Sequence, residues 1–130
     1  MVPSDLEVLE PSDFQRPELM AEPFVRWLDA VCARAGIDPI LTDDGRRPDD
    51  PNPTGSAGKH SLHQRGRAVD LRSRVWTATQ KWRLCAAIVE LAPDAPGMVE
   101  FELVYSPTDV HWHLGVDDRA TAHRLLEADE

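Results

Sequence analysis

The spacing of apolar residues in the first third of the chain predicts an amphipathic helix. Apolar side chains recur at three- and four-residue steps from Phe24 to Cys32, which is typical of a helix that buries one stripe. We expect this helix to begin near Pro17, because proline costs little in a first helical turn. We expect it to end at Gly36, since glycine suits the position after a helix C-terminus.

A second helix is predicted over residues 77–91. Thr77 suits its N-cap, and Pro93 and Pro96 stop it because proline cannot continue a helix. Its predicted apolar face consists of Trp82, Cys85, Ala86 and Val89. We therefore expect this face to pack against the rest of the domain.

Four segments predict β-strands: residues 40–42, 67–71, 98–105 and 110–116. Side chains alternate along a strand, so Ala68 and Asp70 share one face of theirs. The sequence Ser-Pro-Thr-Asp at 106–109 is a natural turn between the last two strands, and Asp117 and Asp118 open a last short helix. The order of these elements indicates the α+β class, with one small domain in which helices flank an antiparallel sheet.

Two segments lack periodic patterning. Residues 1–16 are rich in Pro, Ser and Asp and predict an N-terminal arm draped over a domain formed by residues 17–130. Residues 43–61 are dense in Gly, Pro, Asp and Asn, which predicts a long surface loop. Loops of this length in compact domains are usually functional or disordered, and this one leads directly into the candidate site, so we expect it to form the rim.

Composition excludes several classes of partner. The hydrophobic fraction of 42% and the charged fraction of 28% are ordinary for a globular protein, whereas the net charge of −9 disfavours nucleic acid and anionic lipid surfaces. No apolar run approaches the roughly 18 residues that span a bilayer. The acidic N-terminus lacks the basic-then-apolar order of a secretory signal, so we expect synthesis in the cytoplasm. Cys32 and Cys85 are expected to be buried thiols.

The candidate chemistry begins in residues 61–70, which match the pattern S-x-H-x-x-G-x-A-x-D at all five fixed positions. His63 and Asp70 supply an imidazole and a carboxylate, both good zinc ligands. Gly66 lets the backbone bend between them, and Ala68 keeps space beside the metal.

Further along the chain, His111-Trp112-His113 places two imidazoles on the same face of one strand, with Trp112 directed into the core. A His, Asp and His set that leaves a fourth position open is the arrangement of a catalytic zinc rather than of a structural one. Water bound to such a zinc loses a proton near neutral pH and becomes the nucleophile.

These motifs resemble the family of zinc D-Ala-D-Ala carboxypeptidases and L-alanyl-D-glutamate endopeptidases, which shares its fold with the hedgehog signalling domain. The resemblance covers roughly residues 38–116 and implies zinc-ligand roles for His63 and Asp70. The third ligand is then a His on a late strand. The hedgehog-type version of the family uses the second His of H-x-H, which implies His113, with His111 as a nearby hydrogen-bonding or transition-state group. Other branches have one His followed by an aromatic residue, which His111-Trp112 satisfies.

The resemblance also implies an arginine that grips a substrate carboxylate. The matching text is Thr-Asp-Asp-Gly-Arg-Arg at residues 42–47, which favours Arg46 and leaves Arg47 as the alternative. A guanidinium suits this task because it binds both carboxylate oxygens at once. A solvated loop arginine that balances the neighbouring aspartates is the structural alternative.

In one place the sequence departs from the family. The family has a Glu or Asp shortly before the last ligand, as general base for the zinc-bound water, but the hedgehog-like alignment places Pro107 there. Asp109 is the nearest carboxylate and our candidate base, unless it only caps the turn. Glu100 and Glu102 lie on the preceding strand.

Two functional hypotheses follow. The first is a zinc peptidase that cuts a peptidoglycan stem peptide next to a D-amino acid, as a bacteriophage lysis or virion-associated enzyme with virion proteins as further partners. The second is a catalytically inactive zinc domain of the same fold that acts as a structural or binding module. The departure at Pro107 favours the second hypothesis, and a carboxylate close to the metal would favour the first.

Overall fold

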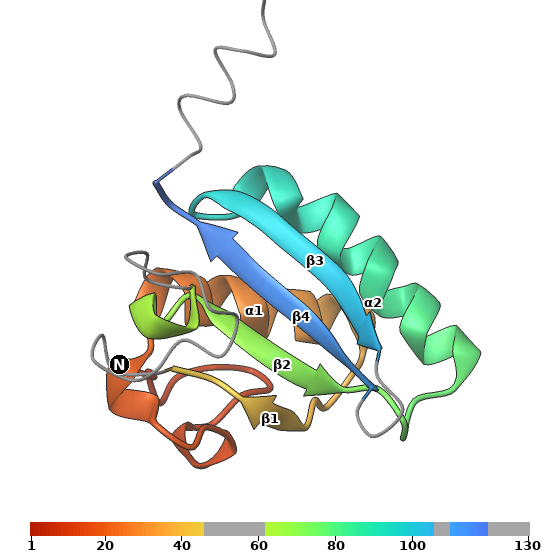
Figure 1. Ribbon diagram of the computed structural model, residues 1–130, viewed down its shortest axis with the longest axis horizontal. Coiled ribbons are helices and arrows are strands. Elements are labelled where there is room, and N and C mark those ends of the chain that lie inside the picture. Colours follow the sequence, from red (N-terminus) through yellow and green to blue (C-terminus); the bar gives the residue numbers. More distant parts are fainter. Residues whose placement is uncertain (46–61, 106–109, 120–130) are drawn as a thin grey trace, which may run out of the picture.

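The computed structural model describes residues 1–45, 62–105 and 110–119, with the backbone alone at 104 and 105. They form a four-stranded antiparallel sheet in the order β1-β2-β4-β3, together with two α-helices (Figure 1), and so confirm the predicted α+β class. The helices are α1 (Glu22–Ala35) and α2 (Ala78–Leu91). The strands are β1 (Leu41–Asp43), β2 (Ala68–Arg72), β3 (Met98–Tyr105) and β4 (Val110–Asp117). Four short 3-10 turns are η1 (Pro11–Asp13), η2 (Pro17–Leu19), η3 (His63–Arg65) and η4 (Ala92–Asp94).

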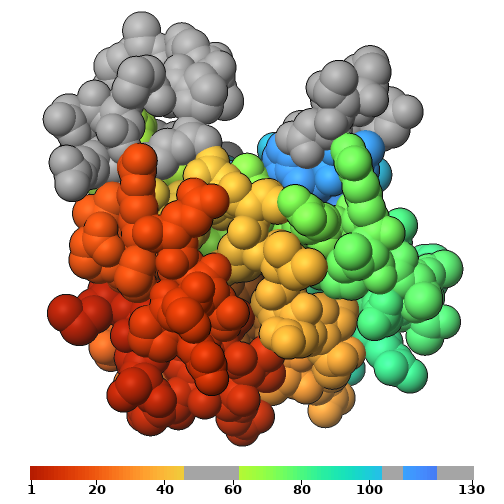
Figure 2. All heavy atoms as spheres, turned by 90° about the horizontal axis from the view of Figure 1, so that it is seen from below, coloured from red at the N-terminus to blue at the C-terminus, as the bar shows by residue number. Residues whose placement is uncertain are grey.

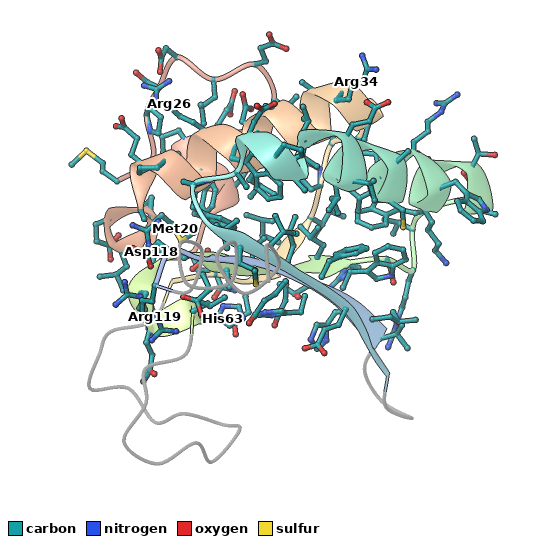
Figure 3. The ribbon with its side chains drawn as sticks, turned by 90° about the horizontal axis from the view of Figure 1, so that it is seen from above. Met20, Arg26, Arg34, His63, Asp118 and Arg119 are labelled. Atoms are coloured by element: carbon teal, nitrogen blue, oxygen red, sulfur yellow. The ribbon has the colours of Figure 1, made fainter. Side chains whose placement is uncertain are left out.

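One face of the sheet packs against the helices, and the other face is not covered by them. Val69 and Leu71 of β2 pair with Leu114 and Trp112 of β4, and these side chains pack into the hydrophobic core with both helices. Figure 3 shows α1 and α2 on this same side of the sheet. Because alternate residues point to opposite faces, Asp70, between Val69 and Leu71, lies on the face that the helices leave uncovered.

Helix α1 begins later than predicted, at Glu22 rather than near Pro17. Pro17 starts only the short turn η2, and the backbone N–H of Ala21 donates to the carbonyl of Gly66 instead of to a helical partner. Pro23 lies in the first turn of the observed helix, where its missing N–H costs nothing, whereas a helix from Pro17 would hold it in the interior. The predicted end is confirmed, since Gly36 adopts a left-handed conformation with φ of 68°.

Helix α2 begins as predicted, because Thr77 and Gln80 form a capping box at its N-terminus. The predicted buried face is wrong. The buried side chains are Leu84, Ala87 and Ile88, while Trp82 is 77% exposed and Val89 73% exposed. The helix carries two apolar sets at helical spacing, and the one with the large aliphatic side chains faces the core. Helical spacing alone could not distinguish the two sets.

The N-terminal arm packs on the domain. Val2, Leu9 and Phe14 are buried in the same core as the helices. The carboxylate of Asp29 in α1 accepts hydrogen bonds from the backbone N–H groups of residues 7, 8 and 9, at 3.1, 2.8 and 2.9 Å. A buried carboxylate that accepts three N–H groups fixes the path of the arm across α1.

Both cysteines are free thiols, as predicted, although Cys85 is only half-buried. Burial, together with the charge of Asp29, raises the pKa of the Cys32 thiol to about 12, so this thiol stays protonated and packs as a small hydrophobe. Asp117, expected to open a last helix, is the final residue of β4, Asp118 and Arg119 form a turn, and the residues from 120 onward lie outside the described part of the chain. Within the described part of the chain, no helix has the length and apolarity needed to cross a membrane.

Candidate metal centre

The sheet brings the two halves of the sequence motif together. Asp70 in β2 pairs directly with His113 in β4, and Arg72 pairs with His111. Side chains of directly paired residues share a face, so Asp70, His111 and His113 all project from the face opposite the helices. His63 lies in η3, just before β2, and Figure 3 shows it on that same side of the sheet.

Three side chains converge on one point. The Nε2 atom of His63 lies 3.3 Å from Oδ1 of Asp70, and the Nδ1 atom of His113 lies 3.2 Å from that same oxygen. One ligand atom from each residue falls within 4.8 Å of the other two. Ligand atoms about 2.0–2.1 Å from a tetrahedral zinc lie about 3.3–3.5 Å apart, so the described residues form a group that could hold a metal ion.

The orientation of His63 suits a ligand. Its Nδ1 atom lies 2.7 Å from the carbonyl oxygen of Asp44, in a buried contact. A carbonyl only accepts, so Nδ1 carries the proton and donates it to this hydrogen bond. Whenever the ring is neutral, its lone pair is therefore on Nε2, the nitrogen on the side of Asp70, and metal-binding histidines are usually oriented by such a hydrogen bond at their other nitrogen.

Small residues of the motif make room for the turn that carries His63. Gly66 has a φ of 68°, and a Cβ atom there would come within 2.0 Å of the carbonyl oxygen of Leu19. Ala68 is fully buried and pairs with Gly115, where a Cβ atom would meet the Leu62 side chain at 2.8 Å. The bend expected of Gly66 is present, and the glycine is also required by the close approach of the Leu19 and Ala21 backbone. The Leu62 side chain thus occupies the space that a side chain at position 115 would fill.

His111 lies beside this group rather than in it. Its Nε2 atom is 3.5 Å from Oδ2 of Asp70, the oxygen that the other two imidazoles do not face. The described residues contain one group of three or more metal-ligating side chains with this convergence, namely His63, Asp70 and His113. The geometry therefore favours His113 as the third metal ligand. His111 instead directs its Nε2 edge toward the carboxylate of Asp70.

Two carboxylates of β3 border the centre. Glu102 pairs directly with His113, and the Oε2 atom of Glu100 lies 3.6 Å from His113 Nε2. Since Nδ1 of His113 faces Asp70, Glu100 approaches the ring from its other nitrogen, as outer carboxylates do in many metal sites. The predicted hairpin, with its turn at 106–109, already implies that residue 102 pairs with residue 113. The proximity of Glu102 to His113 could therefore have been predicted from the sequence.

The charged side chains of this group shift the pKa values of Asp70 and His113 in opposite directions. Burial alone raises the pKa of Asp70, but hydrogen bonds from His113 and His63, with the charges of His63 and His111, outweigh it and hold that pKa well below its ordinary value. Burial lowers the pKa of His113, but the hydrogen bond to Asp70 and the charges of Asp70, Glu100 and Glu102 outweigh it and raise that pKa. A positive charge at this point is therefore stabilised, whether it is a proton or a metal ion.

We expect zinc to stabilise the protein more at pH 8 than at pH 6. A raised pKa of His113 stabilises the metal-free fold fully below the ordinary histidine value of about 6.5, and this contribution is lost as pH rises through the folded-state pKa. Zinc needs the neutral ring, so its binding strengthens over the same interval. Thermal unfolding with zinc and with chelator, at about pH 6, 7 and 8, measures the difference. A zinc-induced shift that does not change with pH would contradict this expectation.

The other predicted site residues cannot be placed. Arg46 and Arg47 belong to the segment 46–61, and Asp109 to the turn 106–109, both of which lie outside the described residues. Comparisons of the chain with known protein families, with curated proteins and with solved structures find no match.

Proposed function

We propose that this protein is a zinc-dependent peptidase that hydrolyses a peptidoglycan stem-peptide bond next to a D-amino acid. The observation that carries the proposal is the convergence of two imidazole nitrogens and one carboxylate oxygen on the open face of the sheet. Imidazole and carboxylate ligands suit zinc, and three protein ligands are the usual number in a catalytic zinc site. The resemblance of the S-x-H-x-x-G-x-A-x-D and H-x-H segments to wall-cutting peptidases supplies the substrate class.

Each residue has a distinct task in this proposal. A bound zinc supplies a water of lowered pKa and polarises the scissile carbonyl. His63, Asp70 and His113 hold the metal, and Asp109 takes the proton of the attacking water. His111, beside Asp70, donates a hydrogen bond to the negative charge that develops on the carbonyl oxygen. Arg46 binds a carboxylate of the stem peptide through its two parallel N–H groups.

A bacteriophage lysis enzyme or virion-associated enzyme suits this proposal, with the bacterial cell wall as the place of action and virion proteins as further partners. A protein of this kind reaches the wall after lysis-type release or from the virion. The acidic charge of the chain, −9, makes nucleic acid an unfavourable partner in either setting.

The second candidate is a zinc-binding module without activity. One observation favours it: Pro107 stands where the family has its acidic residue. In that case the convergent group would organise the fold or a partner surface, and zinc would affect stability without any turnover.

Purified peptidoglycan separates the two candidates. We expect the zinc-loaded protein to release stem-peptide fragments, detected by chromatography and mass spectrometry, and a chelator to stop the release until zinc is restored. The matched control is His63→Gln, which keeps a polar side chain but removes one ligand. Undigested peptidoglycan in the presence of stoichiometrically bound zinc would overturn the peptidase proposal in favour of the module.

A further inference from the structure

The buried carboxylate of Asp44 ties the N-terminal arm to the segment that precedes the metal centre. Asp44 is 1% exposed, and its Oδ2 atom accepts the backbone N–H of Gln15 at 2.5 Å. The backbone N–H groups of Arg16 and Gly45 also donate to this carboxylate. The arm and the end of β1 are therefore held together through one side chain.

The backbone of the same residue contacts the metal centre. The carbonyl oxygen of Asp44 accepts the Nδ1 proton of His63, 2.7 Å away. The side chain of Asp44 thus accepts hydrogen bonds from the arm, while its main-chain carbonyl orients the candidate metal ligand His63. Any displacement of Asp44 that follows release of the arm moves the acceptor that fixes the His63 tautomer.

The segment that follows the arm, residues 17–21, contacts the far side of the turn that carries His63. The backbone N–H of Ala21 donates to the carbonyl of Gly66 at 2.9 Å, and the carbonyl of Leu19 lies where a Cβ of Gly66 would be. Figure 2 shows the N-terminal segment, in red and orange, lying against the yellow segment that leads to Gly45. Residues 15–21 therefore contact both Asp44, whose carbonyl orients His63, and Gly66, which ends the turn that carries His63.

The buried position of Asp44 does not by itself stabilise the fold. Burial raises the pKa of its carboxyl despite the hydrogen bonds from Gln15, Arg16 and Gly45. Its Oδ1 atom has no hydrogen-bond partner among the described residues. Burying a partly satisfied carboxylate lowers the free energy of unfolding compared with a well-packed apolar side chain.

We propose that Asp44 is a positioning residue of the metal centre, through which docking of the N-terminal arm and metal binding at His63 are coupled. The inference rests on the proposed metal site, but not on peptidase activity. Coupling between two binding events is reciprocal, so metal binding stabilises the docked arm by the same factor by which the docked arm strengthens metal binding.

Asp44→Asn tests the proposal, with Asp29→Asn as its matched control. Asp29 is also a buried carboxylate that accepts arm N–H groups, but its contacts are with residues 7–9 and none of its hydrogen bonds involves His63. We expect Asp44→Asn to weaken zinc binding about 10–100-fold, the usual effect of an outer-shell change, and Asp29→Asn to change it less than about threefold. Competition with a chelating indicator measures the affinity, and the visible spectrum of bound Co²⁺ reports altered ligand geometry.

Hydrogen exchange of the unmodified protein provides a second measurement, independent of whether Asp44→Asn folds. Zinc should slow exchange at the amides of Gln15, Arg16 and Ala21 more than at residues 7–9. Equal protection of both sets, or equal loss of zinc affinity in both variants, would overturn the coupling. If the unmodified protein binds no zinc, the proposed metal site itself fails, whereas zinc binding without peptidoglycan cleavage leaves the coupling intact.

Discussion

Zinc is expected to raise the melting temperature of the metal-free protein by about 10 °C, and Asp70→Asn is expected to abolish this shift. At a free zinc concentration about 100 times the dissociation constant, a ligand that binds only the folded state adds about 2.7 kcal/mol to the free energy of unfolding. For a domain of this size, that corresponds to roughly 10 °C. Asp70 is critical because both ligand imidazoles face its Oδ1 atom. Calorimetry with zinc and with chelator measures the shift.

Asp118→Asn is the control for this experiment. Asp118 also lies next to the motif, where its carboxylate pairs with Arg65 at 2.8 Å and Arg67 at 3.3 Å, but it does not belong to the convergent group. This variant should keep the full zinc-induced shift. A shift of unchanged size in Asp70→Asn would mean that zinc binds elsewhere on the chain.

The second large effect concerns the general base. Asp109→Asn should slow release of stem-peptide fragments by about 10²–10⁴-fold while zinc remains bound, because the water then lacks its proton acceptor. Initial rates at saturating zinc, with bound metal measured in the same samples, test this prediction.

Glu100→Gln is the informative comparison for the base. Glu100 contacts His113 from the nitrogen that does not face Asp70, so its loss should weaken zinc binding about 10–100-fold and leave the rate at saturating zinc much less affected. If Glu100→Gln instead shows the large loss of rate and Asp109→Asn does not, the base is Glu100 and the assignment of Asp109 is wrong.

The strand faces that carry the site were predictable from the sequence. The period of two fixes which side chains share a face of each strand, so Asp70 and the two histidines of β4 could be assigned to the face away from the apolar residues. The register that pairs Asp70 with His113 could not be predicted in this way, because neither the motif nor the hairpin determines how β2 pairs with β4. The failure at α2 has an equally simple cause. Trp82 and Val89 repeat at the same helical interval as Leu84 and Leu91, and only tertiary packing against α1 and the rest of the core selects the aliphatic set.

The contacts that hold His63 were not predictable in this way. Its acceptor, the carbonyl of Asp44, lies nineteen residues earlier, beyond a segment without periodic patterning. The contacts at Gly66 come from Leu19 and Ala21, which the sequence pattern assigned to the start of a helix. Backbone acceptors and close approaches of this kind depend on tertiary packing, which no local pattern of side chains encodes.

The alternation of β4 has a consequence for how this chain tolerates insertions and deletions. The strand directs His111 and His113 to the open face, and Trp112, Leu114 and Val116 to the core. An insertion or deletion of one residue within it would exchange the two faces, burying imidazoles and exposing the core side chains. Substitutions can change the candidate metal ligands of this strand and its core packing separately. A one-residue shift along the strand would remove the metal ligands and the core packing together.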